Sequence, residues 1–491
     1  KQKKHNELID LYANYQHTFG SKHDFSAMAG YGWQHFWKKY DDTTLSPEGK
    51  ELFSPYHYET EYYLLSLYGR LNYTYDNRYM LTATLRADAS SRFSKDNRWG
   101  YFPSVALGWR ISEEKFLKDN KVLSNLKLRL SYGQTGQQDI INDYPYMTTF
   151  SVSYPEASYR FGDKWYSTYR PNAYDTDIKW ETTDTWNAGL DYGFLGNRIY
   201  GSLDVYKRHT KDLLNTINVI SGTNFSSILT TNIGEMDNKG VEFSVNAVPV
   251  QTKDFKWDVG FNYTWNTSKI TKLNVIDSES NYVQTGAISN TGKYVQVFMV
   301  GKRPYTFYLC KQAYDENGKP LENQYVQPDG SVSSNETRYS TDKSALPKAY
   351  LGLNTSLTWR NWYFGLSGHG AFGAYVYNYV KADQYLQQVY SDQGNFSNIL
   401  PSTRDLGFNT QQLYTDYFLE SGDFFRIDNM TLAYTFPKLW NSKSSLRLAF
   451  TVQNVCTITG YSGIDPELSS GIDRDVYPRP RTFSFSANLN F

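Results

Sequence analysis

Apolar and polar residues alternate with a period of two at the end of this chain. Phe483, Phe485, Ala487, Leu489 and Phe491 share one face of an extended segment, and Ser, Thr and Asn residues fill most of the other. This alternation predicts a β-strand with one apolar face. It continues to the last residue, so we expect the strand to be fully paired, because a lipid-exposed sheet leaves no edge open. The pattern favours a closed β-barrel in a membrane.

Similar segments recur along the whole chain. Most are about ten to fifteen residues long, which suits strands that cross a bilayer at a tilt. With the two ends of the chain included, we count about fifteen candidate strands. Those between the ends are Phe25–Lys38, Leu65–Tyr75, Tyr79–Asp88, Tyr101–Ile111, Leu126–Tyr132, Trp186–Tyr192, Ile199–Val205, Val241–Ala247, Trp257–Trp265, Leu351–Trp359, Trp362–Gly370, Phe425–Phe436 and Leu446–Val452.

The connections between these strands are of two kinds. Asp76–Arg78, Gly196–Arg198 and Arg360–Asn361 are tight turns. Long polar stretches make up the second kind: Asp41–Glu61, Gln134–Lys179, Lys211–Asn238, Lys272–Lys348, Phe372–Gly422 and Thr457–Pro480. Short turns at one rim and long loops at the other are typical of outer-membrane barrels, whose long loops face outward. Within the fifth loop, Tyr375–Gln388 has roughly helical spacing and predicts a short helix.

Charged residues within the strands follow the same alternation. They fall on the polar face, where they suit a water-filled lumen and avoid the bilayer midplane. The residues expected on this face are Arg70, Arg86, Asp88, Arg110, Arg129, Asp191, Asp204 and Glu242.

Composition agrees with a barrel and excludes other classes. Aromatic residues make up 17% of the chain, which is too many for a disordered segment. The mean hydropathy of −0.61 is low, but a barrel with a wet lumen and polar loops is hydrophilic on average. The sequence has no apolar run long enough for a transmembrane helix. A formal net charge of zero gives no reason to expect nucleic-acid binding.

Candidate chemistry is sparse. The seven histidines are scattered, and the chain has no metalloprotease or nucleophile-elbow motif, so we expect no catalytic residue, no metal and no cofactor. Cys310 and Cys456 are compatible with one disulfide or with two free thiols. Asp465 and Glu467, with Asp473 and Asp475, were considered as a cation site at the rim; turn formation and packing is the favoured interpretation.

Aromatic residues form two candidate sets. Flat rings in the long loops suit contact with sugar faces or peptide side chains, although packing between loops or against a partner protein is the favoured interpretation for any single one. The loop set is Trp165, Tyr166, Tyr169, Tyr174, Tyr377, Tyr379, Tyr385 and Tyr390. The strand set is expected to form the membrane-interface girdle: Trp33, Trp37, Trp109, Tyr132, Trp265, Trp359 and Phe491.

Several motifs, in a set order along the chain, are specific enough to indicate a protein family. They include Leu67–Asp76 (LYGRLNYTYD), Gly100–Trp109 (GYFPSVALGW), Leu128–Gly136 (LRLSYGQTG), Asn232–Phe243 (NIGEMDNKGVEF) and Asp423–Phe436 (DFFRIDNMTLAYTF). Leu85–Phe93, Tyr461–Glu467 and Tyr477–Thr482 belong to the same series. In this order they resemble the SusC/RagA-type TonB-dependent transporters of Bacteroidetes outer membranes, over most of the chain.

The resemblance implies an all-β, 22-stranded transmembrane antiparallel barrel with long extracellular loops and an N-terminal plug. This chain has neither the plug nor the first barrel strands of that pattern, so residues 1–491 are expected to be the C-terminal part of the barrel. The implied function is TonB-dependent import of oligosaccharides or oligopeptides across the bacterial outer membrane. The implied partners are a SusD-like surface lipoprotein, TonB acting through the missing N-terminal region, membrane lipid, and a second transporter–lipoprotein pair.

Two other classes were weighed. An outer-membrane barrel enzyme would carry a catalytic constellation at its rim, and none is found in the sequence. A soluble all-β binding protein, such as a propeller or sandwich, would have similar connections at both ends and regular repeats. The asymmetric connections favour the membrane barrel over both.

Overall fold

The structure is a computed structural model. It describes residues 2–42, 56–118, 120–140, 143–152, 157–218, 226, 228–274, 282–288, 292–389, 398–439, 444–474 and 476–491. Within these residues, no helix has the length and apolar character needed to cross a membrane.

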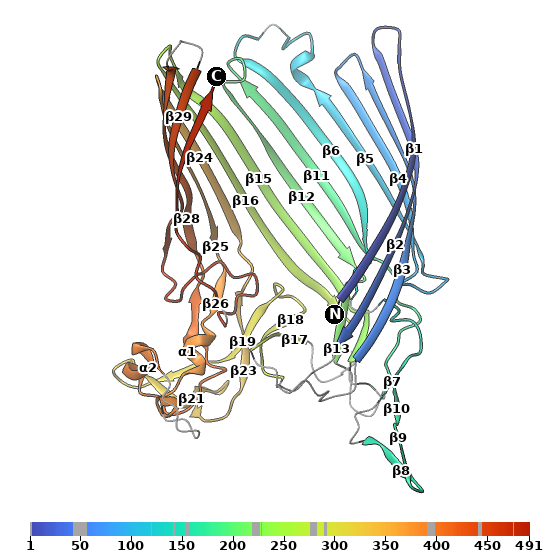
Figure 1. Cartoon of the computed structure of the whole chain (residues 1–491), viewed down its shortest axis with the longest axis vertical. Helices are drawn as coiled ribbons and strands as arrows, with labels where there is room; N and C mark the ends of the chain where they lie inside the picture. The colour runs from blue at the N-terminus through green and yellow to red at the C-terminus, as the bar shows by residue number, and fades with distance from the viewer. Residues whose placement is uncertain are drawn as a thin grey trace.

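One antiparallel sheet of fifteen strands dominates the molecule (Figure 1). Each strand pairs with the next one of the sheet in chain order. The strands are β1 (Gln2–Phe19), β2 (His23–Asp42), β3 (Tyr56–Tyr75), β4 (Tyr79–Ser90), β5 (Trp99–Arg110), β6 (Leu123–Gln137), β11 (Glu181–Phe194), β12 (Ile199–Lys211), β15 (Gly234–Gln251), β16 (Phe255–Leu273), β24 (Ala349–Trp359), β25 (Trp362–Phe372), β28 (Phe424–Leu439), β29 (Ser444–Thr459) and β30 (Thr482–Asn490). The prediction of about fifteen strands is confirmed, and every predicted segment lies in one of them except for the last residues, Ile111 and Phe491, of two segments.

Several strands are longer than predicted. Strands β2 and β3 have 20 residues each, because their pairing continues from Tyr75 opposite His23 to Tyr56 opposite Asp42. Main-chain hydrogen bonding therefore extends past the apolar part of the pattern on which the prediction was based. The loop predicted between Asp41 and Glu61 is correspondingly shorter.

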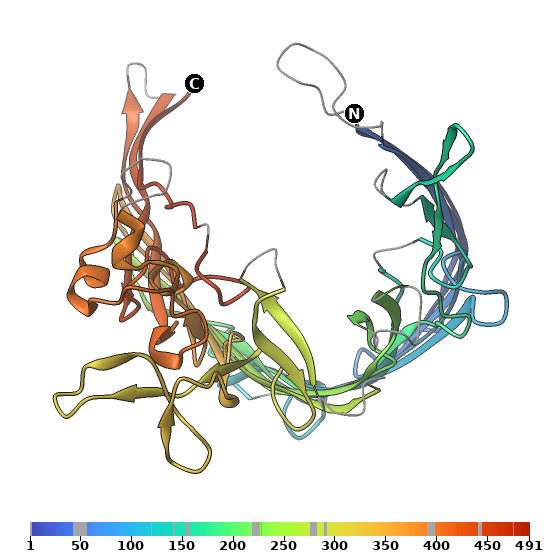
Figure 2. The same ribbon diagram turned by 90° about the horizontal axis from the view of Figure 1, so that it is seen from below.

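The sheet is curved into an open arc, with β1 at one edge and β30 at the other (Figure 2). Between the strands that the structure describes, β1 pairs only with β2 and β30 only with β29. The chain thus supplies one continuous curved wall.

The two faces of this wall differ in polarity. The register aligns apolar residues across neighbouring strands: Leu128 of β6 lies opposite Leu190 of β11, Leu190 opposite Leu203 of β12, and Leu203 opposite Phe243 of β15. Side chains of alternate parity lie on opposite faces, and we assign this apolar row to the convex face, because the outer face of a membrane barrel is the apolar one. An apolar convex face and a polar concave face are what a membrane barrel requires.

The turns and loops lie at opposite ends of the strands (Figure 1). The turn between β3 and β4 places both Asp76 and Asn77 at φ of 52°, and the turn between β11 and β12 uses Asn197 at 61°. Left-handed residues match the twist of a tight hairpin. The predicted turns are therefore confirmed, and a 3₁₀ turn, η1 (Ile111–Glu113), lies in the connection from β5 to β6.

The long loops at the other end contain small sheets and short helices. One loop carries β7 (Phe150–Val152), β8 (Tyr159–Phe161), β9 (Lys164–Tyr166) and β10 (Tyr169–Pro171), and the next carries β13 (Leu214–Asn218) and β14 (Ile228–Asn232). The third carries β17 (Tyr282–Ala287), β18 (Tyr294–Met299), β19 (Thr306–Cys310), β20 (Gln312–Tyr314), β21 (Pro320–Val326), β22 (Val332–Ser333) and β23 (Arg338–Ser344). The fourth carries β26 (Tyr375–Tyr377), α1 (Tyr379–Asp383), η3 (Leu386–Val389), α2 (Pro401–Leu406), η4 (Asp416–Phe418) and β27 (Leu419–Ser421). The helix predicted within Tyr375–Gln388 is confirmed as the short α1.

Candidate functional site

The concave face of the wall carries the strand charges. By register, all eight charged residues predicted to share a face do so, on the side opposite the apolar rows. Arg129 of β6 joins three strands: its Nε lies 3.0 Å from Asp191 on β11, and its Nη2 lies 3.0 Å from Asp204 on β12. Each carboxylate is half-buried and shares the guanidinium, so one positive charge bridges two negative ones and the formal charge of the network is −1.

A glycine makes room for this ion network. A Cβ at Gly189 of β11 would lie 2.4 Å from the Asp204 carboxylate and 2.6 Å from the Arg129 guanidinium. Gly189 therefore lets the side chains of β6 and β12 meet across the strand between them.

A second polar group lies on the wall nearer the first edge. Arg86 donates to Asp88 at 2.7 Å and to Ser66 at 2.8 Å, and the Tyr68 hydroxyl donates to Asp10 at 2.6 Å. The wall thus presents hydrogen-bonded polar groups of both signs rather than a field of one sign. Such a surface suits a hydrated face.

The loops pack into a core of their own above one part of the wall. Its buried members come from three loops: Ile288, Val295, Phe307, Leu309, Ala345, Tyr377, Ala382, Phe408, Leu413, Phe418, Leu419 and Ile472. We call this set the loop core. A bridge between Tyr377 and Ile472 ties β26 to the last loop, and another between Cys310 and Thr415 ties β19 to the segment before η4. The three loops therefore form one packed body.

This packing decides the position of one set of loop aromatics. Tyr377 is fully buried and its hydroxyl donates to the Leu413 carbonyl at 2.9 Å, so it offers no surface to a ligand in this arrangement. Tyr379 packs against the loop core and donates to Asp383 at 3.1 Å. Tyr385 is half-buried, and Tyr390 lies outside the described residues.

The other set of loop aromatics is exposed. Trp165, Tyr166, Tyr169 and Tyr174 lie on the paired strands β8–β9 and β7–β10 and the segment that follows them, which together form an arm extending from the long-loop end (Figure 1). Trp165 is 67% exposed and Tyr169 is 68% exposed. Phe150, Tyr159 and Phe161 add to this surface, which we call the aromatic arm. Exposed apolar clusters of this kind are typical of interaction surfaces, and ligand contact by these residues stays a prediction.

The base of the arm is fixed to the concave wall. Phe102 of β5 packs with Phe93, Ile140, Ile178 and Trp180 in a second buried cluster. Arg92 lies beside it, 2.8 Å from the buried Asp143 and 3.8 Å from the ring centroid of Tyr62. The arm therefore projects from a rigid base.

The carboxylates considered as a cation site bind arginines instead. Buried Arg426 of β28 lies 2.6 Å from Asp465 and 2.6 Å from Glu467, and Arg479 binds the same two carboxylates at 3.0 and 2.9 Å. Across the described residues, no group of three or more His, Cys, Asp or Glu side chains is placed to hold a metal. Asp473 accepts from Tyr461 at 2.6 Å, and Asp475 lies outside the described residues. These contacts fix the last loop to the wall, in agreement with the packing interpretation.

The titratable loop groups with shifted pKa values include Glu420, Asp473 and Cys310. Burial raises the pKa of Glu420, but hydrogen bonds from Ser462 and the charge of Lys381 outweigh it, so the net shift is downward. Burial raises the pKa of Asp473, and it raises the pKa of the Cys310 thiol to about 12. Cys310 and Cys456 are both free thiols.

The predicted girdle residues lie on the convex side by register. Trp33, Trp37, Trp109, Tyr132, Trp265 and Trp359 share the parity of the apolar rows, and Phe491 follows Leu489 on the same parity. Their assignment to the membrane interface stays a prediction.

Two features were not predicted from the sequence. One is Arg426, and the other is the pair Lys207 and Lys239, which share a row of the convex face with Tyr132 and Trp186. Arg426 could have been noticed, because it is a charged residue next to two phenylalanines in a predicted strand. The lysine pair depends on the register between strands, which a single sequence does not supply.

Comparison with known proteins identifies the family to which this architecture belongs. Residues 2–455 match the family described as TonB dependent receptor-like, beta-barrel. The chain belongs to this family. The TonB-dependent receptor barrel is an outer-membrane fold, so the predicted fold class and location are confirmed.

Individual relatives of this receptor barrel are similar over the whole chain. It is 43% identical to the TonB-dependent receptor SusC of Bacteroides thetaiotaomicron, covering 100% of this chain and 50% of that protein. It is 28% identical to the TonB-dependent receptor P3 of Formosa agariphila, covering 99% and 52%. The resemblance to SusC-type proteins is therefore confirmed, and because these relatives are receptors, so is the expectation that the chain is not an enzyme.

Solved structures give the same fold. The chain superposes on a structure described as the RagAB peptide transporter with a TM-score of 0.82 and 24% identity, covering 99% of this chain and 55% of that one. The chain spans about half the length of the relatives it matches.

Proposed function

We propose that this chain forms the C-terminal wall of a TonB-dependent outer-membrane importer that takes up oligosaccharides or oligopeptides. The observation that carries the proposal is the division of one curved sheet into an apolar convex face and a concave face with ion networks such as Arg129 with Asp191 and Asp204. A wall of this kind separates lipid from a hydrated passage. The 43% identity to the TonB-dependent receptor SusC supports the dependence on TonB.

The proposed importer contains more than this chain. Its relatives are about twice as long, and the sheet has two edges that pair on one side only between the described strands. We infer that a plug domain and the remaining strands of a 22-stranded barrel precede residue 1 in a longer polypeptide. TonB would act through that N-terminal region.

The loops supply the outer surface of the proposed importer. A SusD-like lipoprotein would rest on the loop core and the aromatic arm, because both project from the long-loop end of the wall. The resemblance to SusC also supports a dimer of transporter–lipoprotein pairs. Among the loop aromatics, Trp165, Tyr166, Tyr169 and Tyr174 have the exposed ring faces that sugar or peptide contact needs, and Tyr379 and Tyr385 offer partial surfaces.

Uptake measurements test this proposal. The natural polypeptide that carries this chain would be produced in a Bacteroidetes host, and uptake of fluorescent oligosaccharide and oligopeptide libraries would be compared with and without TonB. We expect TonB-dependent uptake of one of the two classes, and recovery of a lipoprotein in mild detergent. Equal uptake of both libraries without TonB, or fractionation of the protein as a soluble species, would disprove the proposal.

A matched pair of variants tests the aromatic arm. Replacing Trp165, Tyr166 and Tyr169 by alanine should lower uptake at low substrate concentration while leaving the amount of folded barrel unchanged. The control replaces Phe116, which is 72% exposed and lies in the short connection at the other end of the wall. If both variants lower uptake equally, the arm does not contact substrate or lipoprotein.

A further inference from the structure

The convex face changes from apolar to charged within three rows across β6, β11, β12 and β15. The first row contains Leu130, Ala188, Val205 and Val241. One step toward the loops, the next row contains Tyr132, Trp186, Lys207 and Lys239, and the third contains Gln134, Asp184, His209 and Asp237. The middle row therefore marks the boundary between the apolar belt and the polar outer rim.

Two positive charges face each other in the middle row. Lys207 of β12 lies directly opposite Lys239 of β15, and both side chains are exposed. Like charges at directly opposed positions destabilise a strand pair. No ion pair or hydrogen bond of either ammonium group is found among the described residues. The pair is thus a source of unneutralised positive charge at the edge of the apolar belt.

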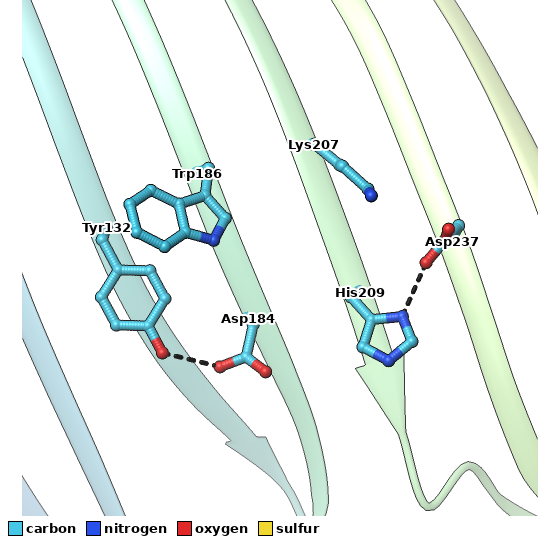
Figure 3. A pocket seen from close by; sticks show the side chains of 6 residues that line it. All are labelled: Tyr132, Asp184, Trp186, Lys207, His209 and Asp237. Atoms are coloured by element: carbon cyan, nitrogen blue, oxygen red, sulfur yellow. Dashed lines mark hydrogen bonds and ion pairs between the residues drawn. The ribbon is translucent and has the colours of Figure 1, made fainter.

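The nearby carboxylates already have partners (Figure 3). Asp184 accepts from Tyr132 at 2.9 Å and from Lys211 at 3.2 Å, and Asp237 accepts from His209 at 2.6 Å. In the figure, Lys207 lies above His209 and beside Asp237, whose carboxylate is bonded to His209. The carboxylates drawn there are thus engaged with other partners, and the exposed ammonium groups are accessible to an anion from outside the chain.

An apolar groove adjoins the lysines. It has a volume of about 600 Å³, and its lining includes Val105, Leu107, Leu130, Ala188 and Val205 together with both lysines. Leu107 is 53% exposed and Val205 is 50% exposed. At the rim of the groove, Trp186 is 62% exposed and its ring lies 4.5 Å from that of Tyr132. Amphipathic rings of this kind are favoured at the headgroup level of a membrane.

We propose that this surface binds a phosphate-bearing lipid of the outer leaflet. The phosphate lies between Lys207 and Lys239, and an acyl chain follows the groove along Leu107, Leu130 and Val205. A lysine is a point charge that suits phosphate, and the adjoining apolar lining favours a lipid over a free anion or an acidic protein segment. The inference depends on the membrane location of the wall and does not depend on the imported substrate.

A lipid-binding assay on the natural polypeptide tests the proposal. The protein would be stripped of lipid in detergent and titrated with lipid A, with dephosphorylated lipid A and with phosphatidylcholine, and bound lipid counted by native mass spectrometry. The test variant is K207A/K239A and the conservative variant is K207R/K239R. The matched control is K211A/K272A, which removes two lysines of the same face that are paired with Asp184 and Glu235.

The expected results are specific. Lipid A should bind K207A/K239A about thirtyfold more weakly than the parent protein, since each lysine near a membrane surface contributes about 1 kcal/mol. The arginine variant and the matched control should bind normally, dephosphorylated lipid A should bind weakly to all, and millimolar inorganic phosphate should not displace the lipid.

Three results would overturn the proposal. Equal binding of lipid A by the parent and K207A/K239A would mean that the lysines do not hold the phosphate. Displacement by inorganic phosphate would identify a simple anion site. Loss of a co-purifying protein from K207A/K239A, with lipid binding retained, would identify a protein contact instead.

Discussion

At the scale of single residues, some positions of the wall need a glycine because side chains from neighbouring strands come too close for a Cβ. Gly189 is such a position, since the Arg129 guanidinium and the Asp204 carboxylate occupy the space that a Cβ would take. The ion network across β6, β11 and β12 therefore depends on a residue without a side chain.

We predict that G189A destabilises the wall by about 1–3 kcal/mol, because the added methyl forces the network apart. The measurement is the urea concentration at which the heat-modifiable folded band of the natural polypeptide disappears. G69A is the control, since a Cβ at Gly69 of β3 meets only the Met28 carbonyl, at 3.8 Å. A midpoint for G189A equal to that of G69A would contradict the role assigned to the glycine.

The second prediction at this scale concerns Cys310. Its thiol is buried in the loop core region and burial raises its pKa to about 12, so almost no thiolate is present at pH 8. In a C456S background, Cys310 should react slowly with iodoacetamide while the protein is folded and fully after heating in detergent. Labelling of the folded protein at the rate of an exposed thiol would show that the loops open readily.

At the scale of elements, the loops behave as a small domain attached to the wall. Phe307 of β19 is fully buried among residues of three loops. We predict that F307A destabilises this body by about 3–5 kcal/mol, the usual cost of removing a buried phenylalanine.

The measurement is limited trypsin digestion of the folded protein. Loop cleavage should accelerate in F307A while heat modifiability of the barrel is unchanged, because the strands do not depend on the loop core. F161A is the control, since Phe161 is 71% exposed on the aromatic arm. Simultaneous loss of the folded band would instead show that loops and wall unfold as one unit.

The attachment of the loops should also depend on pH. Glu420 accepts hydrogen bonds from Ser462, and its pKa is lowered in the folded state. Its contribution to the stability of the folded loops is therefore present above the ordinary glutamate pKa and is lost as the pH falls through the folded-state pKa. Asp473 has the opposite sign: its raised pKa means that its contribution is largest at low pH and is lost as pH rises.

We therefore predict that the hydrogen-exchange protection factors of the Tyr461 and Ser462 amides, which compare the observed rate with the intrinsic rate at the same pH, fall as the pH is lowered below about 4.3. In E420Q this pH-dependent fall should disappear. D473N should stabilise the loop most at neutral pH, where the aspartate carries its unfavourable charge. An unaltered pH profile for E420Q would assign the effect to other carboxylates.

At the scale of the whole molecule, one face of the wall meets lipid and the other meets water. Leu203 and Ser202 are neighbours on β12 that point to opposite faces. We predict that L203R lowers the stability of the inserted barrel by about 2–4 kcal/mol, because an arginine near the bilayer midplane is costly, whereas S202R is tolerated on the concave face. The yields of heat-modifiable protein in the outer membrane give the comparison, and equal yields would reject the orientation of the sheet.

The fifteen strands could be predicted because the lipid imposes a strict alternation on each of them, as at Phe483–Phe491. The loop sheets β17 to β23 could not, because water and neighbouring loops surround them and no single face is apolar. Arg426 is a similar case: its partners Asp465 and Glu467 follow in another loop, and only the fold brings them together. The positions of the loop aromatics depended on tertiary packing, which buries Tyr377 and exposes Trp165.

The loop core has a consequence for the order of assembly. Its members extend from Ile288 to Ile472, and four wall strands lie between them in the chain. Contacts between such distant residues form slowly, because a long stretch of chain must be ordered first. The loop core therefore completes only after these four strands have paired, so any surface that depends on it exists only once this part of the wall is assembled.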